Sequence, residues 1–232
     1  MSGSMRAARL HGIGDLRIES LDVPRPGARE LVVRVEACGI CPTDVRKYAI
    51  GTRDGYPLNP GHEWVGEVVE VGPDATEWSV GQRVCGDTYA GYAEFAVLSV
   101  EPGAWSNGAL AIPADFDAVR ATFVEPLADC VHAVRDQARV GRGSRVCIVG
   151  AGQMGLQMVA VAAAAGADVT VVEPNAERRA LAGEFGAAQT ADGSELAAAA
   201  HGIPNVPIQL GPLSHDGAPE WLAGRTAKPT YR

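Results

Sequence analysis

The sequence has no excess of basic side chains, since 20 Lys and Arg stand against 28 Asp and Glu, which gives a formal net charge of −8. A general nucleic-acid binder would show the opposite balance, with a basic patch and a high pI. No apolar run approaches the roughly 20 residues that a membrane helix needs. The opening MSGSMRAARL also lacks the apolar core of a signal peptide. We therefore expect a cytoplasmic protein that binds neither nucleic acid nor membrane.

Cysteine is sparse as well. Five cysteines are an odd number, and without a secretion signal they indicate reduced thiols or metal ligands rather than a disulfide framework. Glycine (28) and proline (15), in contrast, exceed their average usage of about 7% and 5%. They crowd into the last part of the chain, so we expect residues 201–232 to form an irregular tail rich in both.

The first 100 residues predict short β-strands between turn clusters, as in a small barrel or sandwich. Beyond residue 115 the pattern changes, because apolar residues recur at helical spacing over 118–140 and strands then alternate with helices. This alternation predicts right-handed crossovers and a parallel sheet. The expected strands lie at 31–36, 64–71, 92–97, 145–149 and 169–172, with a weak one at 187–190; the expected later helices lie at 153–165 and 176–185.

A GxGxxG motif stands directly between the predicted strand at 145–149 and the predicted helix at 153–165. This context favours a dinucleotide site, because the glycines allow a tight turn, close approach of a pyrophosphate and close helix packing. The first amides of the helix then face the phosphates. A glycine-rich turn that serves packing alone is the alternative. The expected cofactor-binding residues are Gly150, Gly152, Gln153, Met154, Gly155, Glu173 and Arg178.

Glu173 ends the second strand of this unit, 23 residues after Gly150. An acid at this place accepts hydrogen bonds from the ribose hydroxyls and repels a 2′-phosphate, so NAD is favoured over NADP. Arg178 follows closely, and its positive charge could reduce this preference for NAD over NADP.

A possible metal site is more scattered. Cys38-Gly39-Ile40-Cys41 is a lone CxxC pair, and a structural zinc would need a second pair. His62 and Glu63 follow, and Glu125 comes much later. Cysteine, histidine and carboxylate are the ligand set of a catalytic zinc with an open position. Taken singly, His62 could be a surface residue and Glu125 the start of a helix.

Several segments together carry a family resemblance. They are CPTD at 41–44, GHEWVGEVVEVG at 61–72, VGQRV at 80–84, EPLADCVHAV at 125–134 and GAGQMG at 150–155. They resemble the zinc-dependent medium-chain alcohol dehydrogenase family, and the EPL segment is similar to its sorbitol, threonine and cyclitol dehydrogenase branch. The resemblance covers about residues 6–189. It implies an α/β protein with a GroES-like β-barrel catalytic domain followed by a Rossmann domain.

The resemblance also implies the ligands of one catalytic zinc. Cys41, His62 and Glu63 would be ligands, with Glu63 direct or exchangeable, and Glu125 would be the remaining carboxylate at or near the metal. Cys38 would be structural.

Two neighbours of Cys41 would complete the catalytic group. Asp44 would orient one of the zinc ligands without binding the metal itself. Thr43 would hydrogen-bond the substrate oxygen and begin removal of its proton. The implied reaction is hydride transfer between NAD and a secondary alcohol, either a polyol, an amino alcohol or a cyclitol.

The sequence departs from the family pattern in four places. Pro42 stands where glycine is common, which should stiffen the loop without removing the Cys41 ligand. Cys85 runs straight into Tyr89 and Gly91 without the four-cysteine lobe, so we expect no structural zinc. Arg46 stands where some members carry the last histidine of a proton relay, and a permanently charged Arg is a poor proton carrier. After Glu173 only one weak strand follows, so we expect a shortened chain with a partial Rossmann domain.

The expected limits are therefore 1–122 for the catalytic domain, 123–200 for the partial NAD-binding domain and 201–232 for the tail. Without the Rossmann edge strand, no homo-oligomer of the family's type is expected. Two alternatives stay open. One is an inactive relative that keeps zinc or ADP-ribose binding. The other is a zinc-independent enoyl or quinone reductase, against which the four ligand candidates argue.

Overall fold

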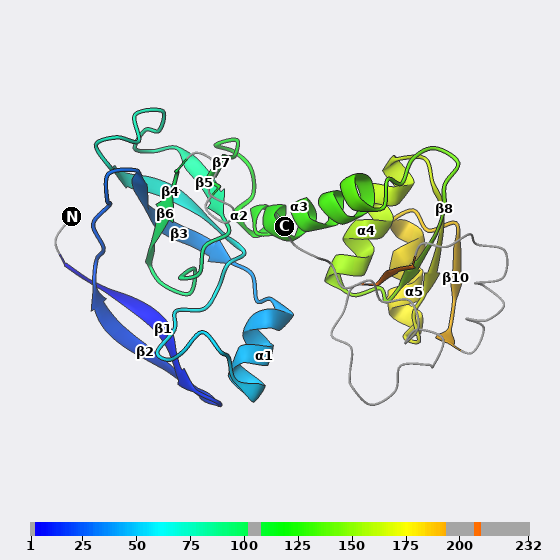
Figure 1. The fold of residues 1–232 in the computed structure, drawn as a ribbon, viewed down its shortest axis with the longest axis horizontal. Helices are drawn as coiled ribbons and strands as arrows, with labels where there is room; N and C mark the ends of the chain where they lie inside the picture. Colours follow the sequence, from blue (N-terminus) through cyan, green and yellow to red (C-terminus); the bar gives the residue numbers. More distant parts are fainter. Residues whose placement is uncertain (1–2, 102–107, 194–206, 210–232) are drawn as a thin grey trace. The chain divides into compact units, whose positions relative to one another are not determined.

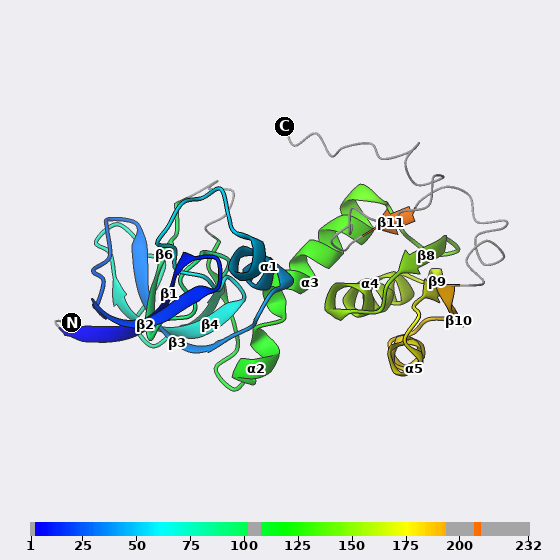
Figure 2. The ribbon, with the colours of Figure 1, turned by 90° about the horizontal axis from the view of Figure 1, so that it is seen from below.

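The computed structural model describes residues 3–101, 108–193 and 207–209. The chain divides into two compact units, Met1–Asp129 and Cys130–Arg232, and Figure 1 and Figure 2 show their ribbons. Within the described residues, none of the helices is long and apolar enough to cross a membrane.

The first unit is built on an antiparallel five-stranded sheet in the order β6-β3-β4-β5-β7 (Figure 1). Its strands are β3 (Glu30–Cys38), β4 (Trp64–Val71), β5 (Arg83–Gly86), β6 (Phe95–Ser99) and β7 (Leu110–Ala111). A separate hairpin joins β1 (Ser4–Gly12) to β2 (Asp15–Asp22). The hairpin is tied back by isolated bridges from Ala7 to Ala93 and from Leu10 to Leu58. The sheet and hairpin together form the small β domain that the sequence predicts.

Alternating apolar residues explain the core of this unit. Leu31 and Val33 of β3, Trp64 and Val68 of β4 and Leu98 of β6 are almost completely buried in one cluster. The predicted strands at 31–36 and 64–71 are confirmed. The predicted strand at 92–97 begins later, at Phe95, because the preceding residues make loop contacts described below.

The second unit holds a parallel sheet in the order β10-β9-β8-β11 (Figure 2). Its strands are β8 (Arg145–Val149), β9 (Asp168–Val172), β10 (Gln189–Ala191) and β11 (Pro207–Gln209). The helices α4 (Gln153–Ala164) and α5 (Ala176–Glu184) alternate with the first three strands. Apolar residues of β8, β9 and α4 share one buried cluster. With β8 as the first strand, this order is the 3-2-1-4 part of the 3-2-1-4-5-6 order of a dinucleotide-binding fold, so the predicted partial Rossmann arrangement is confirmed.

The expectation of an irregular tail over 201–232 needs one correction. Pro207–Gln209 pairs in parallel with Cys147 to Val149 of β8, as the fourth strand of the sheet. The free edge of β8 offers unpaired backbone groups. Pro207 can begin this strand because a first residue tolerates the missing N–H. The rest of the predicted tail lies outside the described residues.

The predicted helical stretch at 118–140 is broken into pieces. Its parts are α2 (Ala118–Ala121), α3 (Val124–Val131) and the π-helical segment η1 (His132–Gln137). Asp117 caps α2 by accepting a hydrogen bond from the Arg120 amide. The stretch ends near Arg139, whose φ of 54° is left-handed, so helical spacing alone did not show where the chain would turn.

Candidate metal centre and dinucleotide site

Cys41 owes its position to the start of the helix α1 (Pro42–Ile50), which the sequence analysis did not predict. The Cys41 Sγ accepts a hydrogen bond from the Thr43 amide, and the Asp44 carboxylate accepts one from the Cys41 amide. This is a reciprocal capping box, with Pro42 at the first helical position, where its missing N–H is harmless. The CPTD segment therefore fixes both a thiol and a carboxylate by local structure alone.

His62 and Glu63 lie on the loop that enters β4. Gly61, at φ +88°, turns this loop, and its amide donates to Asp44 Oδ1 at 3.1 Å. On the other side, the Gly39 amide donates to the Glu63 carbonyl at 2.8 Å. Asp44 therefore joins the Cys41 turn to the loop that carries His62.

Gly39 makes room for the Glu63 side chain. A Cβ built on Gly39 would collide with the Glu63 carboxylate, so the Glu63 side chain occupies space that glycine leaves free. Glu63 is 3% exposed, and a buried carboxylate needs partners that compensate its charge.

Cys41, His62 and Glu63 bring their ligand atoms within 4.8 Å of one another. A thiolate, an imidazole and a carboxylate at this separation match the donor set of catalytic zinc, which uses three protein ligands and leaves a fourth position open. His62 Nδ1 is buried without a hydrogen-bond partner and lies 3.8 Å from Asp44 Oδ2. A buried, unsatisfied imidazole nitrogen beside a carboxylate is consistent with a ring that acts as a ligand through one nitrogen and is oriented through the other.

Cys38 differs from Cys41 in its surroundings. Burial raises the pKa of the Cys38 thiol to about 12, and the charges of Asp44 and Glu63 act in the same direction. Its Sγ donates to the Gly39 carbonyl at 3.4 Å. Burial also raises the pKa of the Cys41 thiol, but hydrogen bonds from Thr43 oppose that effect. Cys41 is thus the better placed of the two thiols to ionise and bind a cation.

Glu125 does not belong to this group of three. It lies on α3 and lines a separate pocket with Cys85, Asp87 and Asp129. Burial raises the pKa of Glu125 to about 7, partly opposed by His62 and reinforced by the nearby carboxylates. The His62 interaction places Glu125 close enough to affect the centre electrostatically.

Tyr92 is a site residue that sequence reasoning missed. Its hydroxyl lies 3.1 Å from both Asp44 Oδ2 and the Gly39 carbonyl oxygen. Burial, and then the charge of Asp44, raise the pKa of Tyr92, so its hydroxyl stays protonated and acts as a donor. The segment AGYAEF contains Tyr92 but no spacing rule connects it to residue 44, so the sequence carried no signal for this contact.

The glycine motif takes the form that the sequence predicts. Gly150 has φ +96°, and its amide donates to the Val172 carbonyl at 2.8 Å. A Cβ on Gly155 would collide with the Gly150 carbonyl oxygen. Gly152 is the N-cap of α4 and provides no side-chain cap, while Gln153 and Met154 open the helix. The first amides of α4 therefore remain available to a phosphate.

Glu173 lies directly against this turn and is 5% exposed. Its carboxylate accepts hydrogen bonds from the Ala151 amide at 2.8 Å and the Asn175 amide at 2.9 Å. Burial raises the pKa of Glu173, but these hydrogen bonds and the charges of Arg178 and Arg179 outweigh it, so the pKa is lowered. Each carboxylate oxygen retains a lone pair for a ribose hydroxyl. Arg178 is exposed in the first turn of α5.

Comparison with known proteins bears on both units. Residues 27–111 match the alcohol dehydrogenase GroES-like domain, and residues 145–198 match the NAD-binding domain of 3-hydroxyacyl-CoA dehydrogenase.

Two curated relatives and one solved structure are similar over most of the chain. The (R,R)-butanediol dehydrogenase of Bacillus subtilis (strain 168) is 30% identical over 215 residues, which are 79% of this chain and 62% of that protein. The L-threonine 3-dehydrogenase of Pyrococcus furiosus is 36% identical over 200 residues, 72% of this chain and 55% of that protein. A structure from Sinorhizobium meliloti 1021, described as a zinc-binding dehydrogenase and bound to NADP, is 33% identical with a TM-score of 0.75. The match covers 83% of this chain and 63% of the S. meliloti chain. The chain thus spans about 60% of the length of these relatives.

Proposed function

This chain belongs to the zinc-dependent medium-chain alcohol dehydrogenase family, and we propose that it holds one catalytic zinc and transfers hydride between a secondary alcohol and NAD. The observation that supports this most directly is the convergence of Cys41, His62 and Glu63. A polyol, an amino alcohol or a cyclitol is the substrate class. We also propose the limits 1–122 and 123–200 for the catalytic and NAD-binding regions, with residues 207–209 adding a strand to the NAD-binding sheet.

Cys41, His62 and Glu63 would hold the zinc, with Glu125 as an additional carboxylate near it. When bound, zinc supplies positive charge that stabilises the negative charge developing on the substrate oxygen. Asp44 holds the centre together, because it accepts hydrogen bonds from the amides of Cys41 and Gly61 at 3.3 Å and 3.1 Å.

The chain's own residues then handle the proton and the cofactor. Thr43 is exposed on the first turn of α1, immediately after the Cys41 turn, and its Oγ1 would accept the proton of the substrate hydroxyl and pass it to solvent. The Gly150 turn and the amides at the start of α4 would bind the pyrophosphate. Glu173 would accept hydrogen bonds from the ribose and disfavour the 2′-phosphate of NADP. The relative from S. meliloti was solved with NADP, so both cofactors belong in the test.

The experiment is an NADH-formation assay with the purified chain, NAD or NADP and a panel of 2,3-butanediol, sorbitol and threonine, together with the zinc content. We expect about one zinc per chain and NADH formation. The variant His62→Ala should lose both, whereas His132→Ala, an exposed histidine of η1, should keep both. Bound zinc without NADH formation would instead favour a binding protein. Reductase activity without zinc would favour the enoyl or quinone reductase class.

A further inference from the structure

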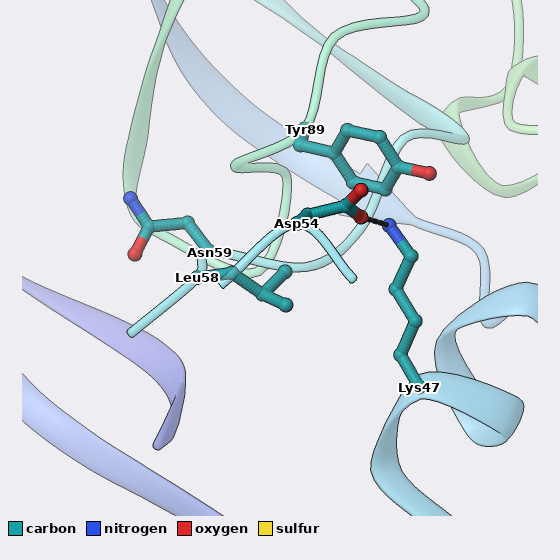
Figure 3. A pocket seen from close by; sticks show the side chains of 5 residues that line it. All are labelled: Lys47, Asp54, Leu58, Asn59 and Tyr89. Carbon is teal, nitrogen blue, oxygen red and sulfur yellow. Dashed lines mark hydrogen bonds and ion pairs between the residues drawn. The ribbon is translucent and has the colours of Figure 1, made fainter. Parts of the chain in front are cut away.

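A pocket of about 440 Å³ lies in the first unit and is lined by Lys47, Asp54, Leu58, Asn59 and Tyr89 (Figure 3). Its volume falls within the range of about 300–1,000 Å³ that is usual for small-molecule sites. None of these residues has a role in the mechanism above.

Tyr89 connects this pocket to the metal centre. Its ring lies 5.2 Å from the His62 ring, between centroids, at an interplanar angle of 59°. The other neighbour of the ring is Lys47, whose Nζ lies 3.9 Å from the ring centroid. One aromatic side chain therefore contacts a proposed zinc ligand and also forms a wall of the pocket.

The loop that carries Tyr89 is firmly held. The Trp64 indole donates to the Thr88 carbonyl at 2.7 Å, and the amides of Ala90 and Gly91 donate to the Gly61 carbonyl at 3.1 Å and 2.9 Å. The same loop is the short connection that stands in place of the family's four-cysteine lobe. Tyr89 is thus placed by the segments that also place His62.

The opposite wall is equally fixed. Lys47 Nζ donates to Asp54 Oδ2 at 2.8 Å, as the dashed line in Figure 3 shows. The Lys47 side chain is only 12% exposed. Leu58 pairs with Leu10 through both backbone hydrogen bonds, at 2.9 Å and 3.0 Å. Asn59 Oδ1 accepts a hydrogen bond from Arg9 Nε at 3.0 Å, which leaves its amide nitrogen as a donor.

The pocket therefore offers donors and acceptors side by side with balanced charge. Lys47 brings a positive charge and Asp54 a negative one. Burial lowers the pKa of Lys47, but Asp54 and Tyr89 outweigh burial, so the pKa is raised and the ammonium stays charged. A single anionic or cationic group would be attracted by one member of this pair and repelled by the other, so neither gains a net electrostatic advantage. A neutral polyhydroxylated chain can use the donors and acceptors without breaking this ion pair.

Resting on the function proposed above, we infer that Lys47, Asp54, Asn59 and Tyr89 form a subsite for the hydroxyl groups of a polyol, beyond the carbon that reacts at the metal. The ammonium and the Asn59 amide donate to hydroxyl oxygens, and the Asp54 carboxylate accepts from hydroxyl hydrogens. The substrate class is thereby narrowed to neutral polyols, with simple diols disfavoured because they lack the additional hydroxyl groups.

The test measures binding by calorimetry, so that it does not depend on turnover. The zinc-loaded chain is titrated with sorbitol, with (R,R)-2,3-butanediol and with threonine. The wild type should bind sorbitol more tightly than the other two. Lys47→Met should weaken sorbitol binding by about tenfold or more, as the loss of a hydrogen bond to a charged group implies, and should leave butanediol binding unchanged.

The control is Arg34→Met, which breaks the exposed ion pair with Glu67, 2.7 Å long and outside the pocket, and should change neither affinity. Equal sorbitol affinity in Lys47→Met and Arg34→Met would overturn the subsite. Absence of a sorbitol preference in the wild type, or tighter binding of threonine, would also overturn it. A chain that binds sorbitol in this way but forms no NADH would keep the subsite and refute the proposed activity.

Discussion

Replacement of Asp44 by Asn tests how the metal centre is held together. Asp44 is 6% exposed, and its carboxylate accepts hydrogen bonds from Cys41 N at 3.3 Å, Gly61 N at 3.1 Å and the Tyr92 hydroxyl at 3.1 Å. An Asn side chain keeps one acceptor oxygen and presents an NH₂ group where the other oxygen was. If the oxygen stays with Gly61, the NH₂ faces the Cys41 amide, which is itself a donor.

The expected loss of stability follows from these contacts. Each hydrogen bond to a charged group contributes about 1.5–3 kcal/mol. Tyr92 can adapt, because its hydroxyl can accept from the new NH₂ and donate to the Gly39 carbonyl, 3.1 Å away. The long Cys41 contact and the negative charge are therefore the principal losses. We expect Asp44→Asn to lower the free energy of unfolding of the metal-free chain by about 2–4 kcal/mol, as measured by urea denaturation.

The zinc affinity separates a positioning role from a purely structural one. Asp44 Oδ2 lies 3.8 Å from His62 Nδ1, so the substitution removes the charge that would orient and polarise this imidazole. Such changes behind a ligand typically reduce metal affinity by about 10–100-fold. Tyr92→Phe keeps the carboxylate, so a chelator competition should show a much smaller loss. Equal zinc affinities in the two variants, or an unchanged affinity in Asp44→Asn, would refute the positioning role.

Four other substitutions, one of them a control, give independent tests. In the metal-free chain, stability should fall as the pH rises from about 4.5 to 7, because Glu125, with a folded pKa of about 7 against an ordinary 4.5, binds its proton more tightly in the folded state. The loss should be about 1–2 kcal/mol after allowance for solvent screening, and thermal scans of Glu125→Gln should not show it. Gly155→Ala should lower stability by about 1–3 kcal/mol, because its Cβ would collide with the carbonyl of Gly150. Gly183→Ala is the matched control, because a Cβ built at this position of α5 meets open space, and it should leave stability unchanged or raise it. Calorimetric thermal scans of both glycine variants measure the difference. Glu173→Gln should weaken NAD binding about tenfold and narrow the preference over NADP in fluorescence titrations of both cofactors.

The second unit was predictable because its signals are local and periodic. The apolar strand at 145–149, the glycine turn and the small-residue helix follow one another without interruption, and the structure reproduces them almost residue by residue. The short strand at 207–209 escaped prediction because three residues carry no periodicity. It forms by pairing with the edge of β8, a contact between segments far apart in the sequence.

The three residues that converge in the candidate metal centre could be identified from the sequence, but the contacts that support them could not. The Cys41 thiol, the His62 ring and the Glu63 carboxylate could be identified from the residues and the family resemblance. Tyr92 could not, because its contact with Asp44 spans 48 positions. For Tyr89, the sequence carries no signal that separates a pocket wall from core packing, whereas in the structure its side chain is 46% exposed and lines the pocket.

Cys41, and not Cys38, is expected to supply the thiolate of a single metal centre. Cobalt is the probe, because a Co²⁺–thiolate bond adds a charge-transfer absorption in the near ultraviolet that zinc does not show. The chain should bind about one Co²⁺ with this absorption. Cys38→Ser should retain the absorption, because the Cys38 thiol donates to the Gly39 carbonyl and is not among the three converging ligand candidates, and Cys41→Ser should lose it. Loss of the absorption in Cys38→Ser with retention in Cys41→Ser, or no thiolate band in the wild type, would rule out Cys41 as the thiolate ligand.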